Sequence, residues 1–284
     1  MKKINKYGLF ELRFNADMET LTYAVFFHDD ESIPVKGFHD GASDAIVRFM
    51  PMKAGDWTYE ITHGGETISG SFRCIEDSRL HGPVKTDGMH FQYADGSRYL
   101  PFGTTCYAWT HQPADLQEAT LDTLKESPFN KIRMCVFPKH MCYNNNEPEY
   151  FPFLQAEDGS WDVHKPNADY WRNLDCSTSQ LAALDIEVDL ILFHPYDRWG
   201  FSELSAEDSL IYLDYCIARL AAYYNVWWSL GNEYDLIFSK EMRDWEALAT
   251  HIRKTDPYHH LLSIHHCLVP YPKVEWMSHC SIQG

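Results

Sequence analysis

The stretch WWSLGNEYDL, residues 227–236, ends an apolar run with an amide and a carboxylate side by side, Asn232 and Glu233. A carboxyl group in a partly dry site has a raised pKa and can donate a proton to a leaving oxygen near neutral pH. Asn232 could then hold a hydroxyl group beside the reacting carbon. A structural role is the alternative, because a carboxylate that begins a helix after a turn is stabilised by the helix dipole.

Five other apolar segments in the same part of the chain also carry polar or aromatic residues at their ends. Arg133 lies within the second of these segments and could hold a further carboxylate in its ionised form. The opposite ends carry ordinary residues, such as Asn130 and Asn225. This polarity predicts one face on which ligand contacts gather. The candidates are Tyr107 and Trp109, Lys139, His194, Tyr196, Asp197 and Trp199, Tyr234, His266 and Gln283.

The elements that must position these residues are strands alternating with helices. We predict strands over 98–109, 131–138, 185–195, 226–233 and 260–267, with a sixth beginning near 278. Helices are predicted over 114–127, 168–184 and 205–224, and before Pro257; Leu116, Leu121 and Leu124 are the expected contacts of the first. This alternation predicts a parallel sheet, and near-continuous apolar strands predict that both of its faces are covered.

Two parallel architectures fit, a (β/α)8 barrel and an open doubly wound sheet. The first turn from strand to helix, TTCYAWTHQPAD, lacks the glycine-rich loop of a nucleotide site. We therefore predict an α/β fold of the (β/α)8 TIM-barrel type, incomplete in this chain, in which chemistry lies at the carboxyl ends of the strands.

Residues 1–80 have a different pattern. LTYAVFF, AIVRFMP, WTYEITH and SGSFRCI are rich in β-branched and aromatic residues, and turn residues separate them. This spacing predicts an antiparallel β-sandwich. We predict two domains, a sandwich over 1–80 and the barrel part over 81–284.

Composition excludes some classes of function. The formal net charge of −17 opposes binding of nucleic acid, and no apolar run is long enough for a membrane helix. The amino-terminal residues lack the pattern of a signal peptide, and the eight cysteines form no CxxC pair. We therefore expect a cytoplasmic protein with reduced thiols. The sequence does not indicate an oligomeric state.

The histidines raise the question of a metal site. The first predicted strand has no HxH pair, and HEXXH is absent. His265 and His266 are adjacent on a predicted strand, so their side chains should point to opposite faces. We expect no metal and no cofactor.

These strand-end residues together resemble the clan A retaining glycoside hydrolases, which are (β/α)8 barrels. The resemblance implies that Glu233 is the acid/base of an Asn-Glu pair, with Arg133 in FNKIRM and His194 in ILFHP as matching site residues. GFHDG and VRFMPMKAGDWTYE resemble the immunoglobulin-like sandwich that precedes barrels labelled endoglucanases. The resemblance implies a carbohydrate substrate, with Trp109, Trp199 and Tyr234 as possible stacking surfaces.

The chain departs from that family in one respect. The family's nucleophile is a second Glu at the end of strand seven, whereas this chain ends in the predicted sixth strand. Asp197 and Asp235 lie on strands where the family places substrate contacts. An unclosed barrel exposes strand edges, which complete proteins avoid, so we expect that this chain is a truncated piece of a longer enzyme. Because the nucleophile is missing, we expect that this piece alone does not turn over substrate. Redesigned chemistry, or a non-catalytic carbohydrate-binding protein on a barrel scaffold, are the alternatives.

Overall fold

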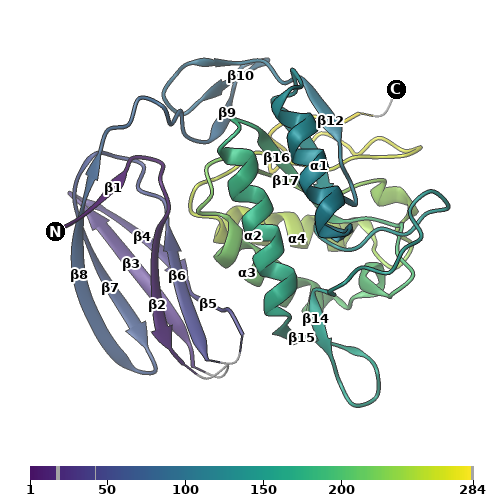
Figure 1. Cartoon of the computed structure of the whole chain (residues 1–284), viewed down its shortest axis with the longest axis horizontal. Helices are drawn as coiled ribbons and strands as arrows, with labels where there is room; N and C mark the ends of the chain where they lie inside the picture. Colours follow the sequence, from purple (N-terminus) through teal and green to yellow (C-terminus); the bar gives the residue numbers. More distant parts are fainter. Residues whose placement is uncertain (17–19, 42, 283–284) are drawn as a thin grey trace.

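The computed structural model describes residues 1–16, 20–41 and 43–282, and the first 75 residues form two sheets that lie beside the helices of the rest of the chain (Figure 1). The larger sheet has the strand order β1-β8-β7-β3-β4 and the smaller one β2-β6-β5. Their strands are β1 (Lys2–Asn5), β2 (Phe10–Asn15), β3 (Thr22–His28), β4 (Glu31–Lys36), β5 (Phe38–His39), β6 (Asp44–Phe49), β7 (Gly55–His63) and β8 (Glu66–Ile75).

Aromatic side chains join the two sheets. Phe26 of β3 and Phe49 of β6 stack with 3.9 Å between their ring centroids, and Phe10 of β2 stacks on Phe72 of β8 at 4.5 Å. All four rings are buried. The predicted strands correspond to β3, β6, β7 and β8. One feature departs from a wholly antiparallel arrangement, because β1 pairs with β8 in parallel.

A small sheet of β9 (Val84–Asp87), β10 (His90–Tyr93) and β11 (Arg98–Tyr99) follows. It packs against Trp227 at the amino-terminal end of β17, where Tyr99 and Phe91 contact the indole. The prediction of one buried strand over 98–109 was wrong. The segment divides between β11 and β12, and Phe102 between them is exposed because it lies at the edge of the next sheet.

The remaining strands form a parallel sheet in the order β12-β13-β16-β17-β18. Arg133 pairs in register with Asp189, and Leu190 with Trp228. The last strand is shorter than predicted, and among the described residues the expected sixth strand is a single bridge between His265 and Ser281. The strands are β12 (Gly103–Thr105), β13 (Lys131–Cys135), β16 (Glu187–Phe193), β17 (Val226–Gly231) and β18 (Leu262–Ser263).

Four α-helices connect these strands: α1 (Ala114–Lys125), α2 (Ala168–Ala182), α3 (Ala206–Leu220) and α4 (Met242–Thr255). Three short 3-10 helices lie at strand ends, η1 (Trp109–His111), η2 (Phe201–Glu203) and η3 (Tyr234–Leu236), and the hairpin of β14 (Phe153–Gln155) and β15 (Trp161–Pro166) lies in the long loop after β13. Among the described helices none is long and apolar enough to cross a membrane.

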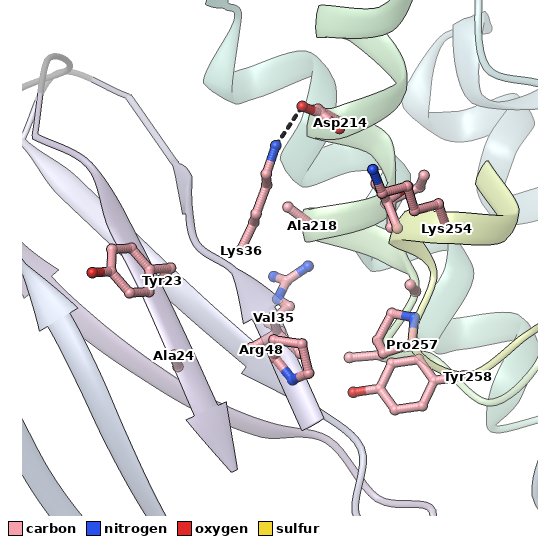
Figure 2. Close-up of a pocket in the computed structure, with 15 residues that line it drawn as sticks. Tyr23, Ala24, Val35, Lys36, Arg48, Asp214, Ala218, Lys254, Pro257 and Tyr258 are labelled. Atoms are coloured by element: carbon pink, nitrogen blue, oxygen red, sulfur yellow. Dashed lines mark hydrogen bonds and ion pairs between the residues drawn. The ribbon is translucent and has the colours of Figure 1, made fainter. Parts of the chain in front are cut away.

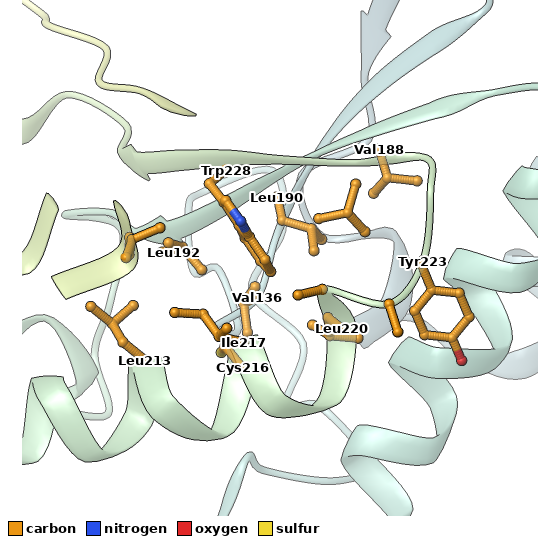
Figure 3. Packing of buried hydrophobic residues seen from close by; sticks show 14 of the residues in the cluster. Val136, Val188, Leu190, Leu192, Leu213, Cys216, Ile217, Leu220, Tyr223 and Trp228 are labelled. Carbon is orange, nitrogen blue, oxygen red and sulfur yellow. The ribbon is translucent and has the colours of Figure 1, made fainter. Parts of the chain in front are cut away.

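Helix α3 begins and packs as its sequence predicts. The Ser205 hydroxyl accepts a hydrogen bond from the backbone N–H of Asp208 at 3.0 Å, which caps the first turn. Leu213, Ile217 and Leu220 lie against the strands below Leu190 and Trp228 (Figure 3).

Helix α1 differs from its prediction in one contact. Leu121 and Leu124 are buried, but Leu116 is 48% exposed. Five residues of helix rotate the side chain by about 500°, so Leu116 lies roughly 140° away from Leu121 around the helix axis. Leu116 therefore falls outside the apolar stripe.

The two faces of the parallel sheet differ in chemistry. Val188, Leu190 and Trp228 face the helices (Figure 3). The alternate positions carry Lys131, Arg133, Glu187, Asp189 and Ser229, and the carboxylate of Asp189 accepts from Lys131 Nζ at 2.8 Å. Both faces of the sheet are covered, as predicted, since every residue of β16 and β17 is buried, but the inner face is polar where the helix-facing side is apolar.

Buried charges hold the amino-terminal sheets against α2 and α3. Arg48 donates two hydrogen bonds to Asp175, both of 2.9 Å, and Arg219 binds Asp175 and Asp40. A cavity of about 230 Å³ lies beside this junction, between β3, β4, α3 and α4 (Figure 2). It is lined largely by aliphatic and ring atoms, with the ion pair of Lys36 and Asp214 at its edge.

Candidate active site at the carboxyl ends of the parallel strands

The chain turns sharply where β17 ends. The N–H of Asn232 donates to the carbonyl of Phe193 in β16, and the next residue, Glu233, has φ 50° and ψ 52°. This left-handed conformation is uncommon for a residue with a side chain and costs roughly 1–3 kcal/mol. The turn ends the strand and leaves the half-buried Glu233 at its carboxyl end.

The side chain of Asn232 is buried and held between two tyrosines. Its Nδ2 donates to the Tyr196 hydroxyl at 2.8 Å, and the Tyr107 hydroxyl donates to its Oδ1 at 3.4 Å. Burial, followed by a hydrogen bond with Glu233, raises the pKa of Tyr196, so its phenol stays protonated. The ends of β12, β16 and β17 thus bring four of the predicted site residues together.

Lys139 lies in the same cluster and is only 5% exposed. Its Nζ lies 4.5 Å from the ring centroid of Tyr107, 4.4 Å from that of Tyr196 and 5.0 Å from that of Tyr143. The ammonium also donates to the Tyr143 hydroxyl at 2.7 Å. Sequence reasoning missed Tyr143, whose only signal was its place in the long loop after the second strand.

Arg133 lies beneath this cluster on the inner face of the sheet. Its Nη2 donates to the Ser229 hydroxyl at 3.0 Å, and its Nε lies 3.4 Å from Asp189 Oδ2. Burial raises the pKa of Asp189, but Lys131 and Arg133 outweigh it and lower the pKa below its usual value. Asp189 and Ser229 therefore fix the guanidinium. The carboxylate inside the apolar strand EVDLILF was a signal that the sequence carried and the prediction did not use.

His194 packs against the ring of Tyr196. It is buried, its Nε2 lies 3.0 Å from the carbonyl of Phe137, and its ring stacks on Tyr196 with centroids 5.6 Å apart. Burial lowers its pKa, so the ring is neutral and Nε2–H donates to that carbonyl. His194 thus positions the tyrosine that binds Asn232.

His266 is buried beside His265, and the two ring centroids lie 5.9 Å apart. The expectation of opposite faces was wrong, because β18 ends at Ser263 and strand alternation does not reach these residues. Burial, then the charges of Arg133 and His266, lowers the pKa of His265 to about 4. Among the described residues no three His, Cys, Asp or Glu side chains form a group that could hold a metal ion.

Trp199 lies in the loop that follows β16 and is partly buried. Its indole donates to Glu147 at 2.9 Å, and Glu147 also pairs with Arg198. Asp197 accepts backbone hydrogen bonds from Trp199 and Ser202, at 2.7 and 2.6 Å. Its carboxylate therefore shapes the loop, and its predicted role as a ligand contact stays a prediction. Glu147 was missed, since pairing between two loops has no local sequence signal.

Two predicted stacking residues are buried. Trp109 is 4% exposed, and its indole donates to the carbonyl of Gln117 at 3.0 Å. Tyr234 packs on Trp245 and Tyr271. Both lie in 3-10 turns that redirect their side chains into the core, so the prediction that they face a ligand was wrong. Gln283 lies outside the described residues.

The other candidate carboxylate, Asp235, is also occupied. It accepts backbone hydrogen bonds from Cys267, Leu268 and Val269 at 2.7–2.8 Å. Burial raises its pKa, but these three bonds lower it overall. Within the described part of the chain, Glu233 is therefore the carboxylate of this cluster that no backbone or cationic group has bound.

Residues 85–283 match the family model described as the apiosidase-like catalytic domain. The chain belongs to the apiosidase-like catalytic domain family. The matched segment contains every candidate residue of the site. Residues 3–64 match a domain of unknown function, DUF5060, which lies ahead of the apiosidase-like domain.

Solved structures resemble the chain over different extents. A provisionally assigned glycoside hydrolase from Bacteroides vulgatus ATCC 8482 is 39% identical with a TM-score of 0.95; the match covers 100% of this chain and 60% of that one. This chain thus spans less than two thirds of that relative. An endo-1,4-beta-mannanase from Rhizomucor miehei, 14% identical with a TM-score of 0.51 over 64% of this chain and 60% of its own, shares the fold alone. No curated protein sequence matches the chain.

Proposed function

We propose that this chain supplies the acid/base half of a glycosidase active site, with Glu233 as the proton donor to the leaving oxygen. One observation carries the proposal. Glu233 is half-buried at the end of β17 and lies next to an amide that hydrogen bonds with Tyr196 and Tyr107 hold in place. The glycoside hydrolase relative and the family match support a glycosidase acting on a carbohydrate substrate.

The geometry gives each neighbour a role. Asn232 uses its Oδ1 and one Nδ2 hydrogen on the two tyrosines, so its second Nδ2 hydrogen is left for a sugar hydroxyl. Tyr196 holds the Asn232 amide beside Glu233, and the ring of His194 stacks on Tyr196. Proton transfer from a positioned general acid is worth roughly 10²–10⁴ in rate.

A retaining mechanism requires a second carboxylate about 5–5.5 Å from the first. The described residues supply no free carboxylate for this role. We propose that the nucleophile comes from a segment that this chain does not contain, since the Bacteroides vulgatus relative is longer than the part that this chain spans. Arg133 is then placed to keep that nucleophile ionised.

The family description makes apiosides the first glycosides to test. The endoglucanase label is not carried forward, and the likeness to the mannanase concerns the fold alone. A carbohydrate-binding role without hydrolysis is the second candidate, because the described part of this cluster holds one carboxylate free of backbone and cationic partners, where the retaining mechanism needs two.

The two candidates separate in a turnover experiment. The 284-residue chain and a longer form that continues as the Bacteroides vulgatus relative does would be assayed on aryl apiosides, with Glu233→Gln in each. We expect turnover by the longer form, a loss of at least about 10²-fold in Glu233→Gln, and unchanged ligand binding. Glu118→Gln on α1 is the matched control. Retention at the anomeric carbon, read by NMR, would support two carboxylates.

Either of two results would contradict the proposal. Robust turnover by the 284-residue chain would show that its nucleophile is not missing. Full activity of Glu233→Gln would remove Glu233 from the chemistry and favour a different acid.

A further inference from the structure

The proposed chemistry gives no role to the ammonium group of Lys139. Among the described residues, its contacts are the three tyrosine rings and the hydrogen bond to the Tyr143 hydroxyl. No carboxylate of the described chain forms an ion pair with it. A charge that is 95% buried is costly unless it is compensated.

The rings give partial compensation. An ammonium over an aromatic face gains about 0.5–2 kcal/mol, and the value is largest where water is excluded. Lys carries three N–H donors, however, and the Tyr143 hydroxyl takes only one. Two donors of a buried cation are therefore left for a group that is not among the described residues.

The position of Lys139 indicates which kind of group this is. Its ammonium lies between Tyr107 and Tyr196, and the hydroxyls of these two tyrosines bind the Asn232 amide beside Glu233. A ligand whose reacting oxygen reaches Glu233 thus has neighbouring substituents near Lys139. Tyr143 is 72% exposed, so the hydroxyl that now binds the ammonium stands on the solvent side and can be displaced.

The nearby acids do not neutralise this cation. Glu147 pairs with Arg198, Asp197 is bound by backbone N–H groups, and Glu233 is hydrogen-bonded with Tyr196. The ammonium therefore creates a local positive region in a protein whose formal net charge is −17. Such a local field selects a single negative group on a ligand, whereas the overall charge disfavours a polyanion.

We propose that Lys139, with the rings of Tyr107, Tyr143 and Tyr196, forms an oxyanion-binding subsite for a carboxylate, sulfate ester or phosphate ester on the sugar beside the bond at Glu233. The subsite rests on the proposed function only in taking the ligand to be a sugar. The anion accepts two charge-assisted hydrogen bonds from Nζ, either beside the Tyr143 hydroxyl or in its place.

The test uses the 284-residue chain with acetate, sulfate and inorganic phosphate as probes. Each is titrated at constant ionic strength against chloride, while NMR follows the ring resonances of Tyr107, Tyr143 and Tyr196. We expect at least one probe to saturate these shifts, and the probe that binds most tightly identifies the carboxylate, sulfate or phosphate class. An absence of saturable shifts with all three probes overturns the subsite.

Variants separate the subsite from general charge effects. Lys139→Met should weaken binding by at least about tenfold, a loss of about 1.4 kcal/mol, and Lys139→Arg should retain it. Tyr143→Phe, which frees a donor, should bind at least as tightly as the wild type, and this variant keeps the test valid if Lys139→Met does not fold. Lys125→Met on α1 is the charge-matched control. Equal binding by Lys139→Met and the wild type would overturn the proposal.

The outcome is independent of hydrolysis. Glu233→Gln should leave anion binding unchanged, since Glu233 is the proton donor of the proposed chemistry and forms no ion pair with Lys139. Anion binding by the 284-residue chain, together with no hydrolysis of glycosides by the longer form, would support the subsite and reject the proposed function. Turnover without anion binding would do the opposite.

Discussion

Asp175 is the residue whose loss should most weaken the junction between the amino-terminal sheets and the helices. Its carboxylate accepts two hydrogen bonds from Arg48 at 2.9 Å and two from Arg219 at 3.0 and 2.6 Å. Both guanidinium groups are buried. Asp175→Asn keeps the shape of the side chain and removes its charge, so two buried cations lose their shared counter-ion.

The expected magnitude follows from the partners that remain. Removing one member of a buried ion pair costs about 3–5 kcal/mol. Arg48 keeps Glu11 at 2.8 Å and Arg219 keeps Asp40 at 3.0 Å, so the loss should lie near the lower end, about 3 kcal/mol. At roughly 2–4 °C per kcal/mol for a chain of about this size, the melting temperature should fall by about 6–12 °C.

The assay is urea unfolding followed by far-UV circular dichroism and tryptophan fluorescence, whose transitions should coincide if both parts of the chain unfold as one unit. Asp56→Asn is the matched control, because Asp56 pairs with Arg73 at 3.3 Å where both side chains are more than half exposed. The control should cost less than about 1 kcal/mol. A loss in Asp175→Asn no larger than that of the control would refute the argument that this network holds the two parts together.

Two further predictions concern the inner face of the sheet and helix α1. Burial raises the pKa of Glu187, while the Trp227 hydrogen bond and the charge of Lys131 lower it. Burial outweighs both, and the pKa rises from 4.5 to about 8. The folded state therefore binds more protons than the unfolded state between these pH values, and stability falls as the pH rises through them. The urea midpoint of Glu187→Gln should rise relative to that of the wild type as the pH increases from about 5 to about 8. A difference in midpoint that does not change with pH would contradict this. In melting experiments Leu121→Ala should cost about 2–4 kcal/mol and Leu116→Ala less than about 0.5 kcal/mol, and equal losses would refute the assigned helix face.

Local patterns predicted much of the fold because the spacing of apolar residues within one segment determines which of its side chains are buried. The alternation in TYAVFF and the apolar stripe of α3 each follow from one segment meeting one apolar layer. The charged residues within the strands were a different case. Asp189 and Glu187 read as interruptions of an apolar strand, yet they mark the polar inner face of the sheet.

There is a physical reason why only part of the site could be predicted from the sequence. A strand end can be located from sequence, but the direction of a side chain beyond it depends on the turn that follows. Trp109 lies four residues past the end of β12 and Tyr234 three past the end of β17, both in 3-10 turns, and both are buried. Contacts between distant segments, such as Arg48 with Asp175, 127 residues apart, leave no pattern in either segment.

Two cations flank Glu233, and their surroundings indicate different partners. Asp189 and Ser229 fix Arg133 within the sheet, which suits a group that acts on another protein side chain in one geometry. Lys139 has no carboxylate partner among the described residues, and its hydrogen-bonding hydroxyl lies on an exposed tyrosine. A ligand can take the place of the Tyr143 hydroxyl on Lys139. A ligand that displaced Asp189 from Arg133 would leave a buried charge unpaired. We therefore propose that Arg133 serves the second carboxylate that the proposed mechanism requires and that Lys139 serves the ligand.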